Sequence, residues 1–431
     1  MPSKTVPKGS PDKPATAAAV CPFCALLCDD LTLRQQADAT FTVASNGCQR
    51  ANAGFARAPL EPQALVAGRT ASLDDAIEAA TRLLRRARQP LFGGLATDVD
   101  GIRAGVNLAE RCGAVLDHVH GDALASMSRM LQARGWYATT LSEVRNRADL
   151  VVVIDVDFSH RYESFRRRCL DPKPAPGQGR RTSKGKGREV VFIGAGKRAP
   201  AAIGADTTLT CRSENLVEVL LALLATLRGY PLANRRPAGT SASALATLAG
   251  KLREARYATF VFAPGALAEH REPAIAAVGD LVDELNLTTR AAMLALGGDD
   301  GGQSAVNTCA WLTGFPLRVG CGQTLHYEPQ AFATRALLDA GAVDALLWID
   351  AFGEHGSPPP GAPLERTVML AATRTSAAAQ CGVFIPVGTP GVDHFARLLR
   401  TDSVVTLALP QQRDSGLPSV AGVLTRILEK F

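Results

Sequence analysis

Hydrophobic and polar positions follow two kinds of pattern in the chain beyond its N-terminal part. In the segment 74–88, DDAIEAATRLLRRAR, apolar residues recur at helical spacing, with Ser72 or Asp74 as the candidate N-cap. The segment 101–113 shows the same spacing, and between the two lies a short apolar run with a glycine turn, LFGGLA at 91–96. Helices and strands in alternation are typical of an α/β protein.

Continuous β-branched runs mark the strands most clearly. The segments 148–158 and 189–196 are uninterrupted enough to predict strands buried on both faces of a parallel sheet. A helix is predicted over 213–228, and the stretch that follows at 231–243 is rich in Pro, Gly and Ser. That composition predicts a domain boundary.

A second round of strands and helices follows this linker, with strands predicted at 258–265, 343–355, 382–391 and 403–410. The sequences ADLVVVIDVDFSH (148–160) and VDALLWIDAFGEH (343–355) share one layout: an acid, an apolar strand, Ile-Asp, and a polar turn that ends in His. Each round predicts a Rossmann-like α/β domain. The expected division is a disordered tail, a small cysteine domain and two α/β domains, at 1–20, 21–68, 69–232 and 233–431.

Length and composition agree with such a fold. The chain has 431 residues, of which 46% are hydrophobic and 20% charged, enough for two or three domains with sizeable cores. The longest apolar run, 216–227, is interrupted by Glu218 and is shorter than the roughly 20 residues of a membrane span. The N-terminal segment lacks the apolar centre of a signal peptide. We therefore expect a cytoplasmic protein with no membrane association.

The positive charge is concentrated in one stretch. The net charge is +6, and the stretch 161–190 alone contains ten Lys/Arg and three Asp/Glu, so the rest of the chain sums to −1. This distribution does not predict a nucleic-acid-binding protein.

Two glycine-rich segments are candidates for phosphate-binding loops. GAGKRAP at 194–200 is only a fragment of the dinucleotide fingerprint, and no complete GxGxxG is present. GGDDGGQ at 297–303 could bring backbone amides close to a phosphate, but a flexible turn is the favoured interpretation.

Four of the ten cysteines form a pattern with the spacing of a metal site. Cys21, Cys24 and Cys28 are followed after nineteen residues by Cys48. Thiolates at this spacing favour a [4Fe–4S] cluster, with a structural zinc ion or unligated thiols as the alternatives. The other six cysteines are scattered and are interpreted as small buried apolar residues. They are Cys112, Cys169, Cys211, Cys309, Cys321 and Cys381.

The cysteine segment CPFCALLCDDL with its distant NGC resembles the B subunit of formylmethanofuran dehydrogenases, a family of the molybdopterin oxidoreductase superfamily. The segments TLSEVRNRADLVVVIDVDF (140–158), VNTCAWLTGFPLRV (306–319) and HYEP (326–329) resemble that family too, so the likeness covers nearly the whole chain past the tail. It implies a molybdopterin-oxidoreductase-like α/β fold. It also implies that Cys21, Cys24, Cys28 and Cys48 hold a [4Fe–4S] cluster.

The resemblance fails at the residues that carry the family's redox chemistry. Members hold tungsten or molybdenum through a Cys-His pair, and the corresponding positions are taken here as Ala123 and Leu124. A family arginine near Gly322 is also expected to be missing, and His118 and His120 are interpreted as structural. No molybdenum or tungsten pterin is therefore expected, and the protein is predicted not to be catalytic itself.

This pattern is similar to the branch of the family found in formyltransferase/hydrolase complexes of methylotrophic bacteria. The resemblance implies a scaffold subunit in one-carbon metabolism, within an assembly that takes formyl from tetrahydromethanopterin to formate through a methanofuran-like carrier. Its partners would be an amidohydrolase-like A subunit, a formyltransferase D subunit, and also a C subunit. The alternatives are a zinc-stabilised binding module and an active tungsten or molybdenum dehydrogenase subunit.

The basic stretch 161–190 has two interpretations in this setting. It can attract the acidic tail of the carrier or a neighbouring subunit. Its Pro, Gly, Ser and Lys content favours a solvated loop instead.

Overall fold

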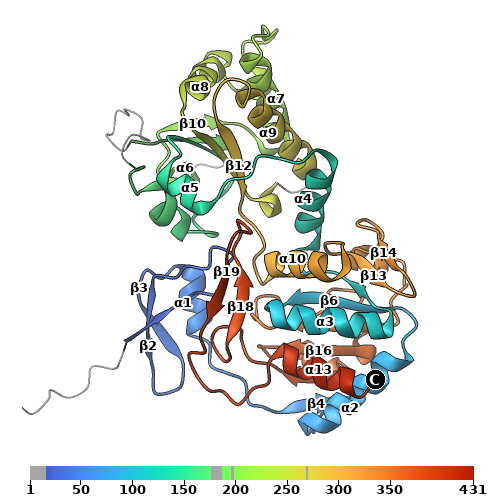
Figure 1. Ribbon diagram of the computed structural model, residues 1–431. Coiled ribbons are helices and arrows are strands. Elements are labelled where there is room, and N and C mark those ends of the chain that lie inside the picture. The colour runs from blue at the N-terminus through green and yellow to red at the C-terminus, as the bar shows by residue number, and fades with distance from the viewer. Residues whose placement is uncertain (1–15, 176–186, 196–198, 268–269) are drawn as a thin grey trace, which may run out of the picture.

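The computed structural model describes residues 16–175, 187–195, 199–267 and 270–431. Over these residues the chain forms two α/β units, which occupy the upper and lower parts of Figure 1, and a small N-terminal lobe beside them. The predicted α/β class with a small cysteine-bearing part is therefore confirmed. In the described ranges, no helix combines the length and the apolar character that crossing a bilayer requires.

The upper unit is built on a five-stranded parallel sheet, in the order β10-β9-β8-β11-β12. Leu150, Val152 and Ile154 of the central strand pack against helices on one face, and Val151 and Val153 pack on the other. This two-sided burial is the physical reason for the uninterrupted apolar run. The elements are α5 (Leu141–Asn146), β8 (Leu150–Ile154), β9 (Glu189–Gly194), α6 (Ala199–Ile203), β10 (Thr207–Thr210), α7 (Leu216–Leu227), α8 (Ala242–Glu254), β11 (Ala258–Phe262), α9 (Arg271–Leu285) and β12 (Ala291–Ala295).

The lower unit is built on a nine-stranded mixed sheet, in the order β14-β13-β7-β6-β15-β16-β17-β4-β5. Its centre is parallel, and its edges are closed by antiparallel strands. The elements are β4 (Ala64–Val66), β5 (Arg69–Ala71), α2 (Leu73–Arg86), β6 (Pro90–Ala96), α3 (Val99–Cys112), β7 (Val115–Leu116), α10 (Gly302–Thr313), β13 (Val319–Cys321), β14 (Leu325–Tyr327), α11 (Thr334–Asp339), β15 (Ala345–Asp350), β16 (Thr367–Ala371), α12 (Ser376–Gln380), β17 (Val383–Pro386) and α13 (Val420–Glu429).

The two sheets divide the chain differently from the predicted domains. Strands β6 and β7 share a sheet with β13 to β17, so the five-stranded sheet between them is an insertion into the lower unit. The predicted boundary at 231–243 separates α7 from α8, and both helices pack on the same five-stranded sheet. The division at 232/233 is therefore wrong. Linker composition indicates an exposed connection and carries no information on which strands pair.

The predicted internal repeat corresponds to the central strands of the two sheets. In the upper unit, the Asp149 carboxylate accepts a hydrogen bond of 3.0 Å from the N–H of Tyr257, just before β11. In the lower unit, the Asp344 carboxylate accepts one of 2.9 Å from the N–H of Gln89, just before β6. Each acid thus fixes the start of the strand that pairs with its own, so the shared sequence layout has a shared structural role.

The N-terminal lobe contains β1 (Thr16–Ala19), β2 (Leu31–Gln35), β3 (Phe41–Ser45) and α1 (Gln49–Phe55). Phe23 and Phe55 meet edge to face with ring centroids 5.0 Å apart. A Cβ at Gly54 would lie 2.5 Å from the Phe23 ring, so glycine is required for this contact. Part of the predicted tail is ordered, because residues 16–19 pair with β2, while residues 1–15 lie outside the described residues.

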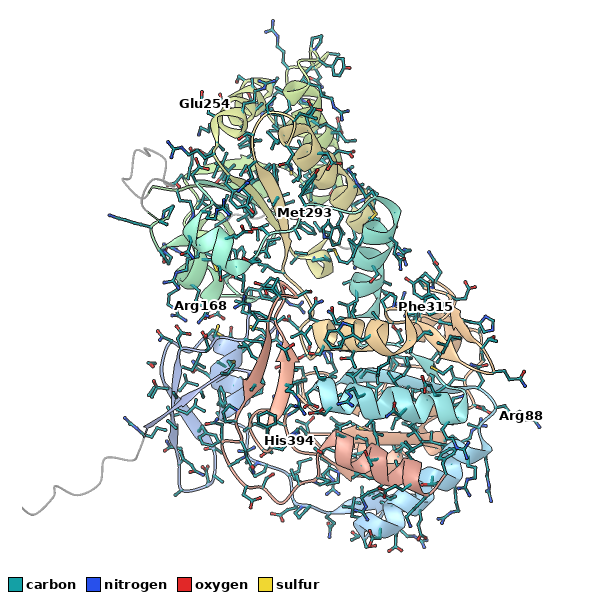
Figure 2. All side chains as sticks on the ribbon, in the orientation of Figure 1. Arg88, Arg168, Glu254, Met293, Phe315 and His394 are labelled. Atoms are coloured by element: carbon teal, nitrogen blue, oxygen red, sulfur yellow. The ribbon has the colours of Figure 1, made fainter. Side chains whose placement is uncertain are left out.

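The basic stretch is partly a structural element. Residues 176–186 lie outside the described residues, but residues 166–170 form a helical turn against the N-terminal lobe. There the Arg168 guanidinium contacts Asp29 at 2.7 Å and Asp30 at 2.6 Å. Figure 2 shows Arg168 at this junction. The solvated-loop interpretation is therefore wrong for this turn. The segment connects two parts of the molecule.

A two-stranded hairpin and one connecting helix complete the described α-helices and strands. Strands β18 (Ala396–Leu399) and β19 (Thr406–Leu409) pair with each other, so the strand predicted at 403–410 exists but joins neither large sheet. In Figure 1 the hairpin stands between the N-terminal lobe and the lower unit. Helix α4 (Gly121–Arg134) connects the lower unit to the upper one.

Candidate functional site

A cavity of about 570 Å³ lies between the two α/β units. Residues that follow β8, β11 and β12 contribute to its wall, so it lies outside the carboxyl ends of the upper parallel strands. That is the usual place for a ligand in an open parallel sheet. Helix α4 forms another wall with Ala123, Leu124 and Met127, and polar groups enter from Asn307 and Asp402.

Ala123 and Leu124 both line this cavity from the first turn of α4. The structure therefore places the two positions at the cleft, where methyl and isobutyl groups can neither bind a metal ion nor move a proton. The start of the helix is tightly determined, because a Cβ at Gly121 would lie 2.1 Å from a carboxylate oxygen of Asp117.

His118 has the contacts of a structural histidine. It is 2% exposed, its Nδ1 accepts the N–H of His120 at 3.0 Å, and its Nε2 lies 3.1 Å from the carbonyl oxygen of Asp300. Since Nδ1 accepts, the proton is on Nε2, which donates to that carbonyl. Burial, helped by the neighbouring His120, lowers the pKa of His118 to about 3, so this ring is neutral at physiological pH.

The glycine-rich segment 297–302 forms a tight turn that presents two buried acids. Asp299 and Asp300 are 3% and 2% exposed. Asp300 has a φ of +55°, and a Cβ at the next residue, Gly301, would lie 1.9 Å from the carbonyl oxygen of Thr97. The predicted turn is therefore present, and its glycines are packed closely against neighbouring atoms. Two acids framed by glycines between a strand and a helix were the signal that could have revealed the site.

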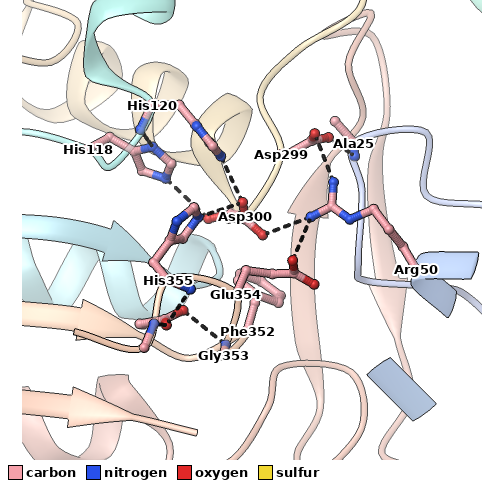
Figure 3. Close-up of polar contacts among 12 residues, drawn as sticks. Ala25, Arg50, His118, His120, Asp299, Asp300, Phe352, Gly353, Glu354 and His355 are labelled. Carbon is pink, nitrogen blue, oxygen red and sulfur yellow. Dashed lines mark hydrogen bonds and ion pairs between the residues drawn. The ribbon is translucent and has the colours of Figure 1, made fainter. Parts of the chain in front are cut away.

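Asp300 is the centre of a polar network that links the turn after β12 to side chains from α1, from the start of α4 and from the turn after β15 (Figure 3). One carboxylate oxygen, Oδ2, lies 2.7 Å from Nε2 of His120 and 3.1 Å from Nε2 of His355. The other, Oδ1, accepts from Arg50 at 3.4 Å. Burial opposes ionisation of this carboxyl, but the two histidine contacts and the Arg50 charge outweigh it and lower its pKa. Asp300 is therefore an anion at neutral pH.

His355 comes from the turn after β15 and is held in place by Asp350. That buried carboxylate accepts the N–H of His355 at 3.0 Å and that of Gly356 at 2.7 Å. Burial alone would lower the pKa of His355, but the hydrogen bond and charge of Asp300 raise it. The polar turn of the repeated motif thus delivers this ring to the site.

The N-terminal lobe joins the network through Arg50 and Ala25. The Arg50 guanidinium lies 3.0 Å from Asp299, whose carboxylate also accepts the N–H of Ala25 at 2.8 Å and the hydroxyl of Tyr162 at 3.1 Å. Glu354 is 3.8 Å from the same guanidinium. Sequence reasoning did not bring these residues together, because Arg50, the pair 299–300 and the pair 354–355 lie far apart in the chain.

The four predicted cysteine ligands lie in the N-terminal lobe beside this network. The N–H of Cys21 donates to the carbonyl of Cys28 at 2.8 Å, which closes a loop around Cys24, and Cys48 stands at the start of α1. Cys21, Cys24 and Cys28 are buried, and burial raises the pKa of all three thiols. The loop thus holds three of the four cysteines close to one another in the chain, and Cys48 approaches from α1.

The spacing of the sulfurs bears on which group they fit. Sulfurs on a single zinc ion lie about 3.8 Å apart, given Zn–S distances of about 2.3 Å. Among the described residues, the one set of three or more ligand side chains with atoms all within 4.8 Å of one another is His120, Asp300 and His355. The four cysteines do not form such a set. The cavity next to Cys24 and Cys48 is only about 10 Å³, so the lobe closes tightly around them.

The scattered cysteines match their predicted role. Five of the six are buried, and Cys112 is half-buried.

The structure also shows what surrounds Gly322, the position where a family arginine is predicted to be missing. Gly322 lies in an exposed turn between β13 and β14. A buried arginine, Arg318, precedes it and donates to Asp117 at 3.1 Å and to the carbonyl of Pro329 in the HYEP segment at 2.7 Å. That arginine orders the segment and does not line the cavity.

Two α/β units with a cleft between them and a cysteine-bearing lobe at one side define a molybdopterin-oxidoreductase-type fold. Acetylene hydratase from Pelobacter acetylenicus shares it with a TM-score of 0.63 at 11% identity, covering 95% of this chain and 69% of that one. No family model matches the sequence.

Similarity in both sequence and structure leads to a more particular relative. The B subunit of the formyltransferase/hydrolase complex Fhc from Methylorubrum extorquens is 29% identical over 377 residues, which cover 85% of this chain and 98% of the relative. The crystal structure of that complex, FhcABCD with methylofuran, superposes with a TM-score of 0.72 at 27% identity, over 85% of this chain and 98% of the matched one. The predicted resemblance to this branch of the family is therefore confirmed.

Subunits of tungsten enzymes are similar as well. The B subunit of tungsten-containing formylmethanofuran dehydrogenase 2 from Methanocaldococcus jannaschii is 28% identical, over 76% of this chain and 77% of the relative. The corresponding protein from Methanococcus maripaludis is 23% identical over 95% of this chain and 97% of the relative.

Proposed function

We propose that the chain is the B subunit of a formyltransferase/hydrolase complex and that it acts there as a scaffold. The observation that carries the proposal is the match to 98% of the length of the Methylorubrum extorquens relative, at both the sequence and the structural level. That relative is solved as part of a complex with methylofuran. A role within an assembly follows from this similarity, and the scaffold role is the further step.

The chemistry of the cleft supports the absence of a redox centre. Oxidation or reduction of a one-carbon unit by two electrons needs a cofactor, because no side chain supplies such chemistry alone. The positions predicted to correspond to the family's metal ligands are Ala123 and Leu124, and both face the cavity with apolar groups. An apolar wall of this kind suits an organic ligand. The first turn of α4 offers tungsten neither a thiolate nor a selenolate.

In this proposal the assembly moves formyl from tetrahydromethanopterin to a methanofuran-like carrier and then releases formate. The partners are an amidohydrolase-like A subunit, a formyltransferase D subunit, and also a C subunit. The chain contributes a fixed surface on which these partners meet, and the carrier reaches it through them.

We further propose that Cys21, Cys24, Cys28 and Cys48 hold a [4Fe–4S] cluster. Three of the four cysteines are buried in one short loop that the Cys21–Cys28 backbone hydrogen bond closes, and Cys48 stands at the start of α1 in the same lobe. Most buried apolar residues of the lobe pack together with those of β8 and β9. A bound iron–sulfur cluster generally supplies electron transfer. Here its proposed contribution is to stabilise the fold of the cysteine loop.

A second candidate function is that of an active tungsten or molybdenum dehydrogenase. The four retained cysteines and the similarity to the two tungsten enzymes favour it. It requires a metal ligand at the cleft other than residues 123 and 124. A zinc-stabilised binding module is the weakest of the three, because the sequence lacks the second C-x2-C pair that structural zinc sites usually use.

Purification of the intact complex under anaerobic conditions, from cells that produce the chain with its cognate partners, tests the proposal. We expect four kinds of polypeptide, formyltransferase and formyl-hydrolase activity, and neither tungsten nor molybdenum. Omission of this chain should dissociate the assembly and lower both activities. Stoichiometric tungsten or molybdenum with viologen-linked formate oxidation would overturn the scaffold role in favour of the dehydrogenase.

A further inference from the structure

We propose that His120, Asp300 and His355 form a binding site for a first-row divalent metal ion such as Zn²⁺. The three ligand atoms, two imidazole Nε2 and one carboxylate oxygen, lie within 4.8 Å of one another. This site is distinct from the cysteines and does not depend on the proposed function.

The geometry is close to what one ion requires. Nitrogen and oxygen ligands bind zinc at about 2.0–2.2 Å, so a tetrahedral site places them about 3.4 Å apart. The two separations to Oδ2 of Asp300 are 2.7 Å from His120 and 3.1 Å from His355. A small outward movement of the rings would admit the ion between the two Nε2 atoms and Oδ2 of Asp300. The ion would replace the hydrogen atoms that lie in these two contacts. Figure 3 shows both rings directed at the same carboxylate.

Each ligand is held by a firm support, as metal ligands usually are. Arg50 occupies the other oxygen of Asp300, and His118 donates to the Asp300 carbonyl. The N–H of His355 is fixed by Asp350. The peptide of His120 is fixed by Nδ1 of His118. The ion would therefore enter a preformed site whose backbone is already in place.

The local charge favours a cation. Four carboxylates belong to this network, Asp299, Asp300, Asp350 and Glu354, and Arg50 is the cationic side chain that pairs with three of them. The ligands also differ in access. Asp300 is 2% exposed, while the side chains of His120 and His355 are 23% and 26% exposed, which leaves an entry path.

Two histidines and one carboxylate leave coordination positions open. Sites with three protein ligands bind water or substrate in the remaining position, whereas closed structural sites use four. His120 also lines the 570 Å³ cavity, so an open position would lie at the cavity wall. The ligand class that fits is a small oxyanion or water bound to the ion.

Titration of the metal-depleted full-length chain with Co²⁺, followed by visible absorption, tests the site. We expect visible absorption of Co²⁺ bound by nitrogen and oxygen ligands, displaced by Zn²⁺. His355→Ala should weaken binding by at least about tenfold. His326→Ala, a change to an exposed histidine of β14, should leave binding unchanged. Circular dichroism melting confirms that each variant is folded.

Anomalous diffraction at the metal absorption edge supplies an independent outcome, because the cysteines can also bind Co²⁺. A peak between residues 120, 300 and 355 supports the site. A peak at the cysteines alone, or Co²⁺ affinity that is the same in His355→Ala and wild type, would overturn it. Failure of the complex to assemble would bear on the proposed function and leave this result unaffected.

Discussion

The Arg50 guanidinium lies 3.0 Å from the Asp299 carboxylate, and this contact joins the cysteine-bearing lobe to the turn that presents Asp300. Arg50 follows Cys48 by two residues, at the start of α1. The cysteine loop reaches the same carboxylate through the N–H of Ala25. Contacts to Asp299 thus connect the cysteine site with the site around Asp300, although the two sites have no ligand in common.

Substitution of Arg50 should destabilise the protein strongly. Arg50→Met leaves two buried carboxylates, 3% and 2% exposed at the side chain, without their cation. Breaking a buried pair by removing one partner costs about 3 kcal/mol or more. Urea unfolding of the variant should show this loss. Arg82→Met is the matched control, because that arginine is 61% exposed in a helical surface pair, and it should change stability by less than about 0.5 kcal/mol. Equal effects in the two variants would contradict the buried-network interpretation.

Arg188 should be as sensitive, for a different reason. Its guanidinium is 1% exposed and donates to backbone carbonyls, among them Ala148 at 2.8 Å and Val144 at 2.7 Å. Burial lowers the pKa of this arginine to about 10, yet it remains charged at neutral pH. Arg188→Met would leave several carbonyls without a donor and should cost about 3 kcal/mol or more in the free energy of unfolding.

A lysine at this position separates charge from geometry. Arg188→Lys keeps the charge but cannot reproduce the planar fork, so it should recover only part of the loss. Thermal and urea unfolding of both variants measure this. Full recovery by lysine would show that charge alone is required.

The cysteine proposal predicts a specific pattern of iron content. The wild-type complex, prepared without oxygen, should contain about four iron atoms per chain. Cys24→Ser should lose most of this iron together with its visible absorption. Cys112→Ser alters a half-buried cysteine outside the lobe and should retain it. Zinc in place of iron, or iron unaffected by the change at residue 24, would refute the cluster.

The cavity should bind apolar probes through the wall formed by α4. Ala123→Trp fills part of the 570 Å³ space and should lower the affinity for an environment-sensitive apolar fluorophore several-fold. Ala133→Trp, on the exposed end of the same helix, is the control and should leave the affinity unchanged. Fluorescence titration distinguishes the two. Equal binding to both variants would show that the probe binds elsewhere.

The local elements of the fold are predictable from the sequence. The spacing in segment 74–88 predicts the helix that forms as α2, and the apolar run 148–158 predicts a buried strand and contains β8. Both patterns are properties of neighbouring residues, so no distant contact is needed to recognise them. The repeated motif around Asp149 and Asp344 is recognisable for the same reason.

The site is only partly predictable because it is assembled by strand pairing. His120, Asp300 and His355 follow the ends of β7, β12 and β15 by four or five residues. The fold brings these three connections together, although β12 belongs to the other sheet. The pairing of β6 with β15 joins residues about 250 positions apart, and no local pattern encodes it. The acids of the glycine-rich turn have a visible signal, but only their burial distinguishes a built site from an ordinary turn.

The insertion of one sheet into the other has a consequence for how the protein is made. A ribosome delivers the whole five-stranded sheet, through residue 295, before it delivers the first residue of β15 at 345. Until then β6 has only β7 as a parallel neighbour, and one edge of the central sheet stays open. Domains tend to fold as they emerge during synthesis. The upper unit can therefore fold before the ribosome has made strands β15 to β17, which the sheet of the lower unit requires.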